Sequence, residues 1–431
     1  MPHPLLAVGA IPGVAPPLIW SLPFVALLVS IAAFPLIAPR WWHHNFPWVA
    51  LPIGALVVVY YIFFFGNAER MFYTAHEYVA FISLIGSLFV VSGGLHIGLH
   101  GRLSPRENVI LLAVGAVIAN IVGTTGASVI LIRPFIRGNS WRWSPYHVVF
   151  FIFIVSNCGG ALTPIGDPPL FLGYIKGVPF FWVLGALWYK WALAIALLLA
   201  AYYVFDRREY ARHSLRERIE AERPERTRVD GLLNLVFIAV ILGAAFIQRP
   251  MFVREAIMIA AAVASYLTTP KRIHKLNEFT FFPVKEVAIL FAGIFGAMVP
   301  TLDWLSVNAA SLGLRDAGHF YWITGSLSTL LDNAPTYLNF LTAAMALHGL
   351  SAESPLQVMQ FAAQHADFLR SISIAAVFFG AGTYIGNGPN FMVKSIVDHA
   401  GLRTPTFIEF VYKYTLPILL PLWIITYLWV R

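Results

Sequence analysis

Apolar stretches long enough to cross a bilayer recur along almost the whole chain, and they constrain the fold more than any other feature. A crossing helix needs roughly 20 apolar residues, because each residue advances the helix by about 1.5 Å. Only 12% of the 431 residues are charged, against about 25% in soluble domains. Ionised side chains are costly in hydrocarbon, so this composition indicates a polytopic membrane protein. The predicted spans are residues 18–38, 48–66, 77–99, 146–175, 178–205, 231–247, 252–269, 286–302, 371–397 and 406–430.

Two further apolar stretches, residues 107–136 and 319–347, carry helix-disrupting residues at their centres. The first centre reads Gly123-Thr124-Thr125-Gly126, and the second reads Asp332-Asn333-Ala334-Pro335-Thr336. Each stretch is too short for two crossings, so we expect a re-entrant hairpin of two short arms joined at a polar tip. Such a tip is tolerated at membrane depth only where it lines a cavity enclosed by protein. The alternative is one long, tilted helix.

Residues 206–230 form the most charged stretch of the chain and contain eight arginines. Because Lys and Arg accumulate in cytoplasmic loops, we expect this stretch to be a cytoplasmic linker between an N-terminal half (1–205) and a C-terminal half (231–431). Five predicted crossings lie on each side of the linker, and an odd number inverts the second half relative to the first. Both termini are therefore predicted to be periplasmic, in an inner (cytoplasmic) membrane. The first hairpin would open from the inside and the second from the outside.

An internal repeat supports two related halves. Residues 160–171 align with residues 380–391 at an offset of 220, with seven of twelve identical, where chance gives roughly one. Prolines and glycines inside both segments must break a helix. Broken helices free backbone carbonyls, which bind cations, and expose helix N-termini, which attract anions. The predicted fold is an all-α polytopic membrane protein of two inverted-topology halves, each with five crossings, one re-entrant hairpin and one broken helix.

Two carboxylates in apolar surroundings, Asp167 and Asp332, are the leading functional candidates. Burial makes a charged carboxylate costly unless a cation or a proton accompanies it. The alternative is a structural carboxylate held by a neighbouring Asn or Arg. Three other acids, Glu77, Glu286 and Asp303, lie near predicted span ends and are expected at the interface.

Basic residues keep an anionic substrate under consideration. Arg133 and Lys394 each follow a polar element, and either is a possible charge partner for Asp167, Asp332 or a substrate carboxylate. The alternative for both is snorkelling to the interface. His96 and His100 have the i,i+4 spacing of a shared metal site, but without a nearby acidic partner they are expected to be interfacial histidines.

Neither an ATP-binding P-loop nor a catalytic motif occurs in the sequence. We therefore expect a protein that is not an enzyme, has no cofactor and draws its energy from an ion gradient. The net charge of +8 follows from the excess of Lys and Arg in cytoplasmic loops and does not indicate a nucleic-acid partner.

The stretch from Ser156 to Pro169 resembles the NhaD-type sodium/proton antiporters of the ion transporter superfamily, and the stretch from Leu331 to Tyr337 is similar to the same family. Relatives include arsenite permeases and citrate or dicarboxylate carriers. The resemblance covers nearly the whole chain. It implies a homodimer with a scaffold domain and a mobile transport domain that holds both hairpins and moves like an elevator. It also implies Na⁺ sites between each hairpin tip and the adjacent broken helix. The implied ligands are Thr124, Thr125, Ser128, Thr163, Gly166 and Asp167 in the first half, and Asp332, Asn333, Thr336, Thr383, Asn387 and Asn390 in the second.

Two departures from the carboxylate carriers favour a cation. The first tip reads Thr124-Thr125-Gly126 where those carriers have Ser-Asn-Thr, and the second begins with Asp332 where they have a neutral Ser. The primary hypothesis is Na⁺/H⁺ antiport, with Asp167, Asp332 and Asn333 as candidate Na⁺ ligands. The chain also resembles a group described as citrate transporters, so a sodium- or proton-coupled carrier of citrate, another organic anion or an arsenite-like oxyanion remains the alternative. A channel or a membrane-embedded structural subunit is a third hypothesis, which the matched helix breaks argue against.

Overall fold

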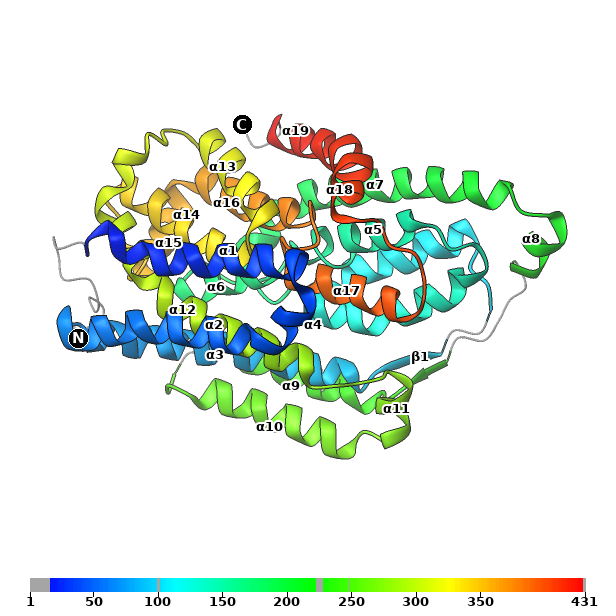
Figure 1. The fold of residues 1–431 in the computed structure, drawn as a ribbon, viewed down its shortest axis with the longest axis horizontal. Helices are drawn as coiled ribbons and strands as arrows, with labels where there is room; N and C mark the ends of the chain where they lie inside the picture. Colours follow the sequence, from blue (N-terminus) through cyan, green and yellow to red (C-terminus); the bar gives the residue numbers. More distant parts are fainter. Residues whose placement is uncertain (1–15, 99–100, 222–227, 248, 429–431) are drawn as a thin grey trace.

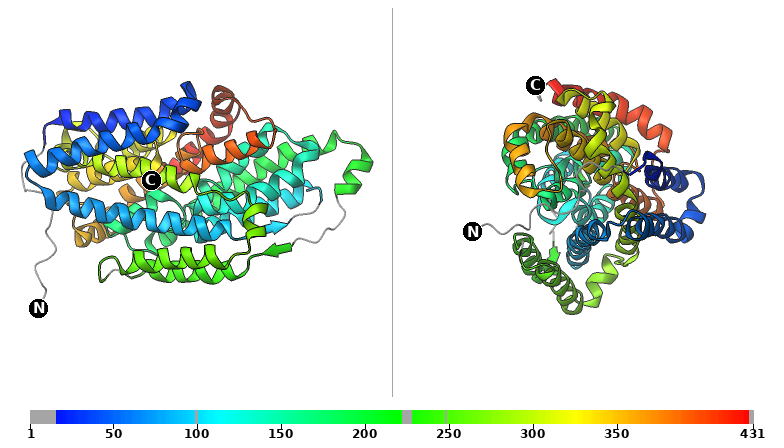
Figure 2. Two further views of the ribbon diagram at one scale, coloured as in Figure 1. Left: turned by 60° about the horizontal axis from the view of Figure 1, so that its bottom comes forward. Right: turned by 90° about the vertical axis from the view of Figure 1, so that its left-hand side faces the viewer.

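The computed structural model describes residues 16–98, 101–221, 228–247 and 249–428. The chain is mostly helical and forms an elongated bundle (Figures 1 and 2). Among the described residues, seven helical segments, one of them broken near its centre, are long and apolar enough to cross a membrane, so the protein is a multi-pass membrane protein. The other predicted crossings are built from shorter helices.

Five long helices correspond to predicted apolar spans, and four of them extend past an end of the span. They are α1 (Leu22–Ile37, after a short 3₁₀ turn, Leu18–Ser21), α2 (Pro39–Val59, continued by a π-helical turn, Tyr60–Phe64), α3 (Ala68–Gly93), α7 (Trp182–Ala211) and α12 (Phe282–Asn308). Helices α2 and α3 begin well before positions 48 and 77, where the predicted spans start. Their first turns hold charged and polar residues, which end an apolar stretch without ending a helix.

The first predicted hairpin is α4 (Pro105–Asn139), which is broken at Gly123. Gly123 has φ 78° and ψ 157°, a backbone conformation that glycine adopts at little cost. The two arms meet again at the open end, where the amide of Leu103 donates to the carbonyl of Gly138 at 2.8 Å. Asn108 and Asn139 exchange side-chain hydrogen bonds of 2.7 and 2.8 Å. The stretch is therefore a hairpin and not one long helix.

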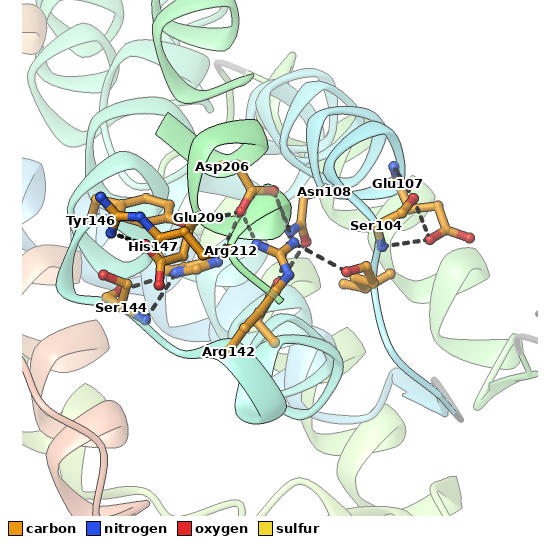
Figure 3. A network of polar contacts seen from close by, with 12 residues as sticks. Ser104, Glu107, Asn108, Arg142, Ser144, Tyr146, His147, Asp206, Glu209 and Arg212 are labelled. Atoms are coloured by element: carbon orange, nitrogen blue, oxygen red, sulfur yellow. Dashed lines mark hydrogen bonds and ion pairs between the residues drawn. The ribbon is translucent and has the colours of Figure 1, made fainter. Parts of the chain in front are cut away.

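A buried ion pair fixes the open end of this hairpin to α7 (Figure 3). Asp206, on α7, pairs with Arg142, just after α4. The same carboxylate accepts bonds from Asn108 at 2.9 Å and from Tyr146 at 2.8 Å. Both charged side chains are buried, and Arg142 also donates to the carbonyl of Leu103 at 3.1 Å.

The second predicted hairpin consists of α13 (Ala317–Leu330) and α14 (Asn333–Leu347). Leu331 leaves the helical conformation with φ −115° and ψ 162°, and Asp332 caps the second arm. The rings of Phe320 and Phe340 pack between the arms at 6.1 Å. Helices α13 and α14 lie at the end of the bundle opposite to α8 (Leu215–Ala221) and β1 (His96–Gly98) (Figure 1).

Both repeat segments interrupt a helix, as predicted. The first lies between α5 (Pro145–Ile154) and α6 (Pro168–Lys176), with one 3₁₀ turn at Cys158–Gly160. The second lies between α16 (Ala366–Gly380) and α17 (Gly388–His399). The hydroxyl of Thr163 donates to the carbonyl of Asn120 at 2.6 Å and accepts from the amide of Gly166 at 3.0 Å. Thr383 makes the equivalent bonds to Thr329, at 2.6 Å, and Gly386, at 3.2 Å.

The remaining elements complete the bundle. They are a 3₁₀ turn at Ser140–Arg142, α9 (Leu233–Ala245), α10 (Val253–Thr268), α11 (Lys271–Leu276), a 3₁₀ turn at Ala309–Leu312, α15 (Pro355–Gln364), α18 (Phe407–Phe410), a π-helical segment (Val411–Leu419) and α19 (Leu420–Leu428).

The arginine-rich segment contains regular structure that its composition did not predict. Helix α7 continues to Ala211, α8 follows, and β2 (Arg228–Asp230) pairs antiparallel with β1. The pairs are His96 with Asp230, Ile97 with Val229 and Gly98 with Arg228. The sheet joins this segment to the end of α3.

Candidate functional site

Asp167 directly precedes α6 and is almost completely buried, with 1% of its surface exposed. Pro168 and Pro169 start the helix, since proline at the first helical positions sacrifices no hydrogen bond. The Asp167 carboxylate does not cap the amides of its own helix. It is therefore free to accept bonds from other elements.

Three side chains from three other elements donate to this carboxylate. Thr124, at the first hairpin tip, donates its hydroxyl to Oδ1 at 2.9 Å. Asn333, at the second tip, donates to Oδ2 at 2.7 Å, and Asn387, before α17, donates to Oδ1 at 2.9 Å. Among the described residues, no basic side chain forms an ion pair with Asp167. Both hairpin tips and both broken helices therefore meet at one carboxylate that has only neutral partners.

Three helices begin around this carboxylate. Asp167 precedes α6, Asn387 precedes α17, and Asp332 caps α14 by accepting from the amide of Ala334 at 3.0 Å. Helix N-termini carry partial positive charge. This partial charge offsets part of the cost of burying carboxylates in a setting without a basic partner.

A chain of amides joins the two halves beside the carboxylate. Asn157 donates to Asn390 at 2.6 Å and accepts from Asn387 at 3.1 Å. Ser128, on the second arm of the first hairpin, is 2.8 Å from the hydroxyl of Ser156. All these side chains are buried. Ser156 and Asn157 were not among the predicted ligands, although they are polar residues directly before the first repeat segment.

A small cavity of about 20 Å³ lies next to Asp167. The first hairpin tip, with Thr124 and Thr125, forms one wall, and residues of α3, including Leu84 and Leu88, form another. A volume of this size admits about one water molecule. Within the described part of the chain, lining this cavity is the only contact of Thr125 with the site.

Several predicted ligands make contacts across the two halves. Gly166 contributes its carbonyl, which accepts from the amide of Thr124 at 2.8 Å. The second-half residues Asn333 and Asn387 donate to the first-half carboxylate of Asp167. Thr336 bonds the carbonyl of Asp332 at 2.8 Å, while Thr163, Thr383 and Asn390 hold backbone or amide groups of the broken helices.

The basic residues considered as partners lie elsewhere. Lys394 pairs with Asp398, one turn along α17, and not with Asp167 or Asp332. Arg133 pairs with Glu278 at 3.1 Å. His96 is buried and bonds Asn277 at 2.7 Å, while His100 lies outside the described residues. No group of three or more metal-ligating His, Cys, Asp or Glu side chains occurs in the described part of the chain.

Lys190 is a buried base that was not among the candidate residues predicted from the sequence. It lies on the buried face of α7, and its Nζ has no hydrogen-bond partner among the described residues. Its Nζ lies over the ring of the neighbouring Tyr189, 5.4 Å from the ring centroid, in a cation–π contact. The next residue, Trp191, donates to the carbonyl of Gly159 at 2.9 Å, so this turn of α7 packs against the first broken helix. A charged residue in the middle of a long apolar helix was the available signal.

Comparison with known families then identifies the class of protein. Residues 14–430 match the family described as "Putative citrate transport". The chain belongs to this family. The match covers nearly the whole sequence, and together with the seven long apolar helices it makes the protein a secondary transporter of the membrane. A search of curated proteins finds no match to the chain.

Proposed function

We propose that this transporter exchanges Na⁺ for protons, with Asp167 as the group that binds them alternately. The observation that carries the proposal is a buried carboxylate at the junction of both hairpin tips and both broken helices, with no ion pair among the described residues. A buried carboxylate without a fixed cation is stable as a carboxylic acid or with a bound cation. Proton and Na⁺ then compete for one site, which couples their movement in opposite directions.

Oxygen ligands for Na⁺ are present around Asp167. The amide oxygen of Asn333 is buried and accepts no hydrogen bond from the described residues, while the amide nitrogen of the same side chain bonds Asp167. Thr124 offers a hydroxyl oxygen on the other side. Hard cations prefer carboxylate, amide and hydroxyl oxygens, and the adjacent cavity has the size of one small ion or water. Asp332, at the neighbouring tip, is the second candidate carboxylate.

The test is Na⁺-driven proton movement in proteoliposomes. We expect Asp167→Asn to abolish it, because an amide keeps the size of the side chain but neither binds a proton nor attracts a cation. Asp398→Asn is the matched control, since this acid is exposed and pairs with Lys394 on α17, and it should keep the wild-type rate. Asp332→Asn shows whether the second carboxylate shares the exchange. Wild-type exchange in Asp167→Asn would exclude the proposal.

Cotransport of citrate or another organic anion is the second candidate function. The family description favours it. The buried base Lys190, whose Nζ has no hydrogen-bond partner among the described residues, and the three helix N-termini around Asp167 also favour it. Uptake of labelled citrate into the same proteoliposomes separates the two candidates. Citrate uptake that requires Na⁺ or a proton gradient, and that is lost in Lys190→Met, would favour the anion carrier.

The remaining features rest on the resemblance to the ion transporter superfamily. We infer that the two hairpins and broken helices move together as a transport domain in an elevator-type cycle, in a homodimer in the inner membrane. The two hairpins open toward opposite ends of the bundle (Figure 1), which supports access from alternate sides.

A further inference from the structure

Six residues form a buried ion network, here called the end cluster, at the end of the bundle where the second hairpin opens. Its members are Tyr61, Arg70, Glu77, Lys176, Asp303 and Glu353. Arg70 and Lys176 are 1% and 5% exposed. Buried charges at this density are stable only when each has a close partner of opposite charge.

Glu353 is the centre of the end cluster. It lies in the loop between α14 and α15 and accepts from Arg70 at 2.9 Å and from Lys176 at 2.8 and 2.9 Å. Lys176 also pairs with Glu77 at 2.7 Å. Asp303 accepts from Arg70 at 3.2 Å and from Tyr61 at 2.9 Å.

The end cluster connects two pairs of helices. Helix α6 has Asp167 at its start and Lys176 at its end, while α14 starts at Asn333 and leads into the loop of Glu353. These two helices pack closely, since a Cβ at Gly173 would lie 2.4 Å from the hydroxyl of Tyr337. They form the site pair of helices.

The other pair is α3 and α12. Tyr78 donates to the carbonyl of Ala288 at 2.9 Å, and the rings of Phe81 and Phe291 stack at 4.6 Å. The ion pair of Arg70 with Asp303 therefore lies within the pair of α3 and α12. The ion pair of Lys176 with Glu353 lies within the site pair. Arg70 with Glu353, and Glu77 with Lys176, join one pair of helices to the other.

We propose that the two joining ion pairs, Arg70 with Glu353 and Glu77 with Lys176, form a latch that holds the site helices against α3 and α12 in this conformation and must open in each transport cycle. Glu77 and Glu353 are then positioning residues for transport, since neither touches Asp167. The inference rests on the proposed function only in requiring alternate access, and it is independent of which ion is carried. When the site helices move, the internal ion pair of each helix pair remains intact.

Two variants, each neutralising one acid of the end cluster, distinguish a latch from a network that only stabilises the fold. Glu77→Gln weakens only a joining pair, whereas Asp303→Asn weakens only a pair internal to α3, α12 and the turn of Tyr61. Each removes one negative charge and keeps a similar shape. Glu353→Gln is the second joining variant, in case Glu77→Gln does not fold. It removes the charge that pairs with Arg70 across the two helix pairs, and it also weakens the internal pair with Lys176.

The measurement is the distance distribution between spin labels at Phe72→Cys on α3 and Leu356→Cys on α15, in full-length protein with Cys158→Ser. Phe72 and Leu356 are 54% and 61% exposed, so the labels do not disturb packing. In the joining variants we expect a second distance to appear. The population at the wild-type distance, relative to the population at the new distance, should fall by about tenfold, in line with the loss of one charge-assisted hydrogen bond. Asp303→Asn should keep the wild-type distribution.

Identical distributions in all variants, or equal changes in Asp303→Asn and Glu77→Gln, would overturn the latch. Na⁺-driven proton movement is measured on the same preparations. Its absence from the wild type would contradict the proposed exchange but leave the distance result intact, so the two failures are distinguishable.

Discussion

At Gly166 the broken helix passes so close to itself that no side chain fits. A Cβ there would lie 2.0 Å from the carbonyl oxygen of Gly160, which is backbone and cannot turn away. The carbonyl of Gly166 also holds the first hairpin tip through the amide of Thr124. We expect Gly166→Ala to displace the loop, separate Thr124 from Asp167 and lower transport at least roughly tenfold, as misplaced site groups commonly do.

The matched control is Gly185→Ala in α7, where nothing lies within 4 Å of the added methyl group. It should keep transport and stabilise the helix by roughly 0.5–1 kcal/mol. The measurements are ion movement in proteoliposomes and thermal unfolding in detergent. Equal activity of Gly166→Ala and Gly185→Ala would contradict the role given to this close approach.

Single residues of the site were predictable where a polar side chain stood beside a helix breaker in an apolar stretch. This pattern selected Thr124, Asp167 and Asn333, which the structure brings into contact. It did not select Asn157 or Lys190, because neither stands next to a tip or a proline of the repeat. The pattern also did not predict that one carboxylate accepts hydrogen bonds from both halves. The offset between two repeats in the sequence does not tell how close the repeats lie in space.

At the scale of elements, the first hairpin depends on its anchor at α7. We expect Arg142→Met to destabilise the protein by roughly 3–5 kcal/mol, because it leaves the buried Asp206 without its cation. Thermal unfolding in detergent measures the loss. The double variant Arg142→Met with Asp206→Leu should recover much of it, since no unpaired charge remains. A single variant as stable as the wild type would show that Asn108, Tyr146 and His147, whose Nε2 lies 3.4 Å from the carboxylate, suffice to hold Asp206.

The elements were predictable where the sequence holds a strong local signal. The breaks at Gly123 and before Asp332 were located because glycine, proline and hydroxyl residues interrupt otherwise apolar stretches. The starts of α2 and α3 were placed too late, since hydropathy measures burial in lipid and not helix formation. The pairing of β1 with β2 was missed because it joins residues far apart in sequence, and each strand is only three residues long.

At the scale of the whole molecule, the end cluster makes stability depend on pH through Glu353. Burial raises the pKa of this carboxyl, but Arg70 and Lys176 outweigh burial and hold the pKa well below its ordinary value of 4.5. The folded protein therefore binds a proton at Glu353 less readily than the unfolded chain does. The stabilisation by Glu353 is complete above about pH 4.5 and is lost as the pH falls from there through the lower value of the folded state.

Comparison with Glu353→Gln isolates this contribution, because the other acids of the protein titrate in both. We expect the wild type to unfold at a higher temperature than Glu353→Gln at pH 7, and this difference to shrink as the pH is lowered from about 5 toward 3. Thermal unfolding of both proteins in one detergent, at matched ionic strength, measures it. A difference that stays constant across this range would mean that Glu353 contributes through shape and not through charge. In that case Arg70 and Lys176 would be held mainly by Asp303 and Glu77, and the joining pair of Arg70 with Glu353 would contribute little to holding the site helices against α3 and α12.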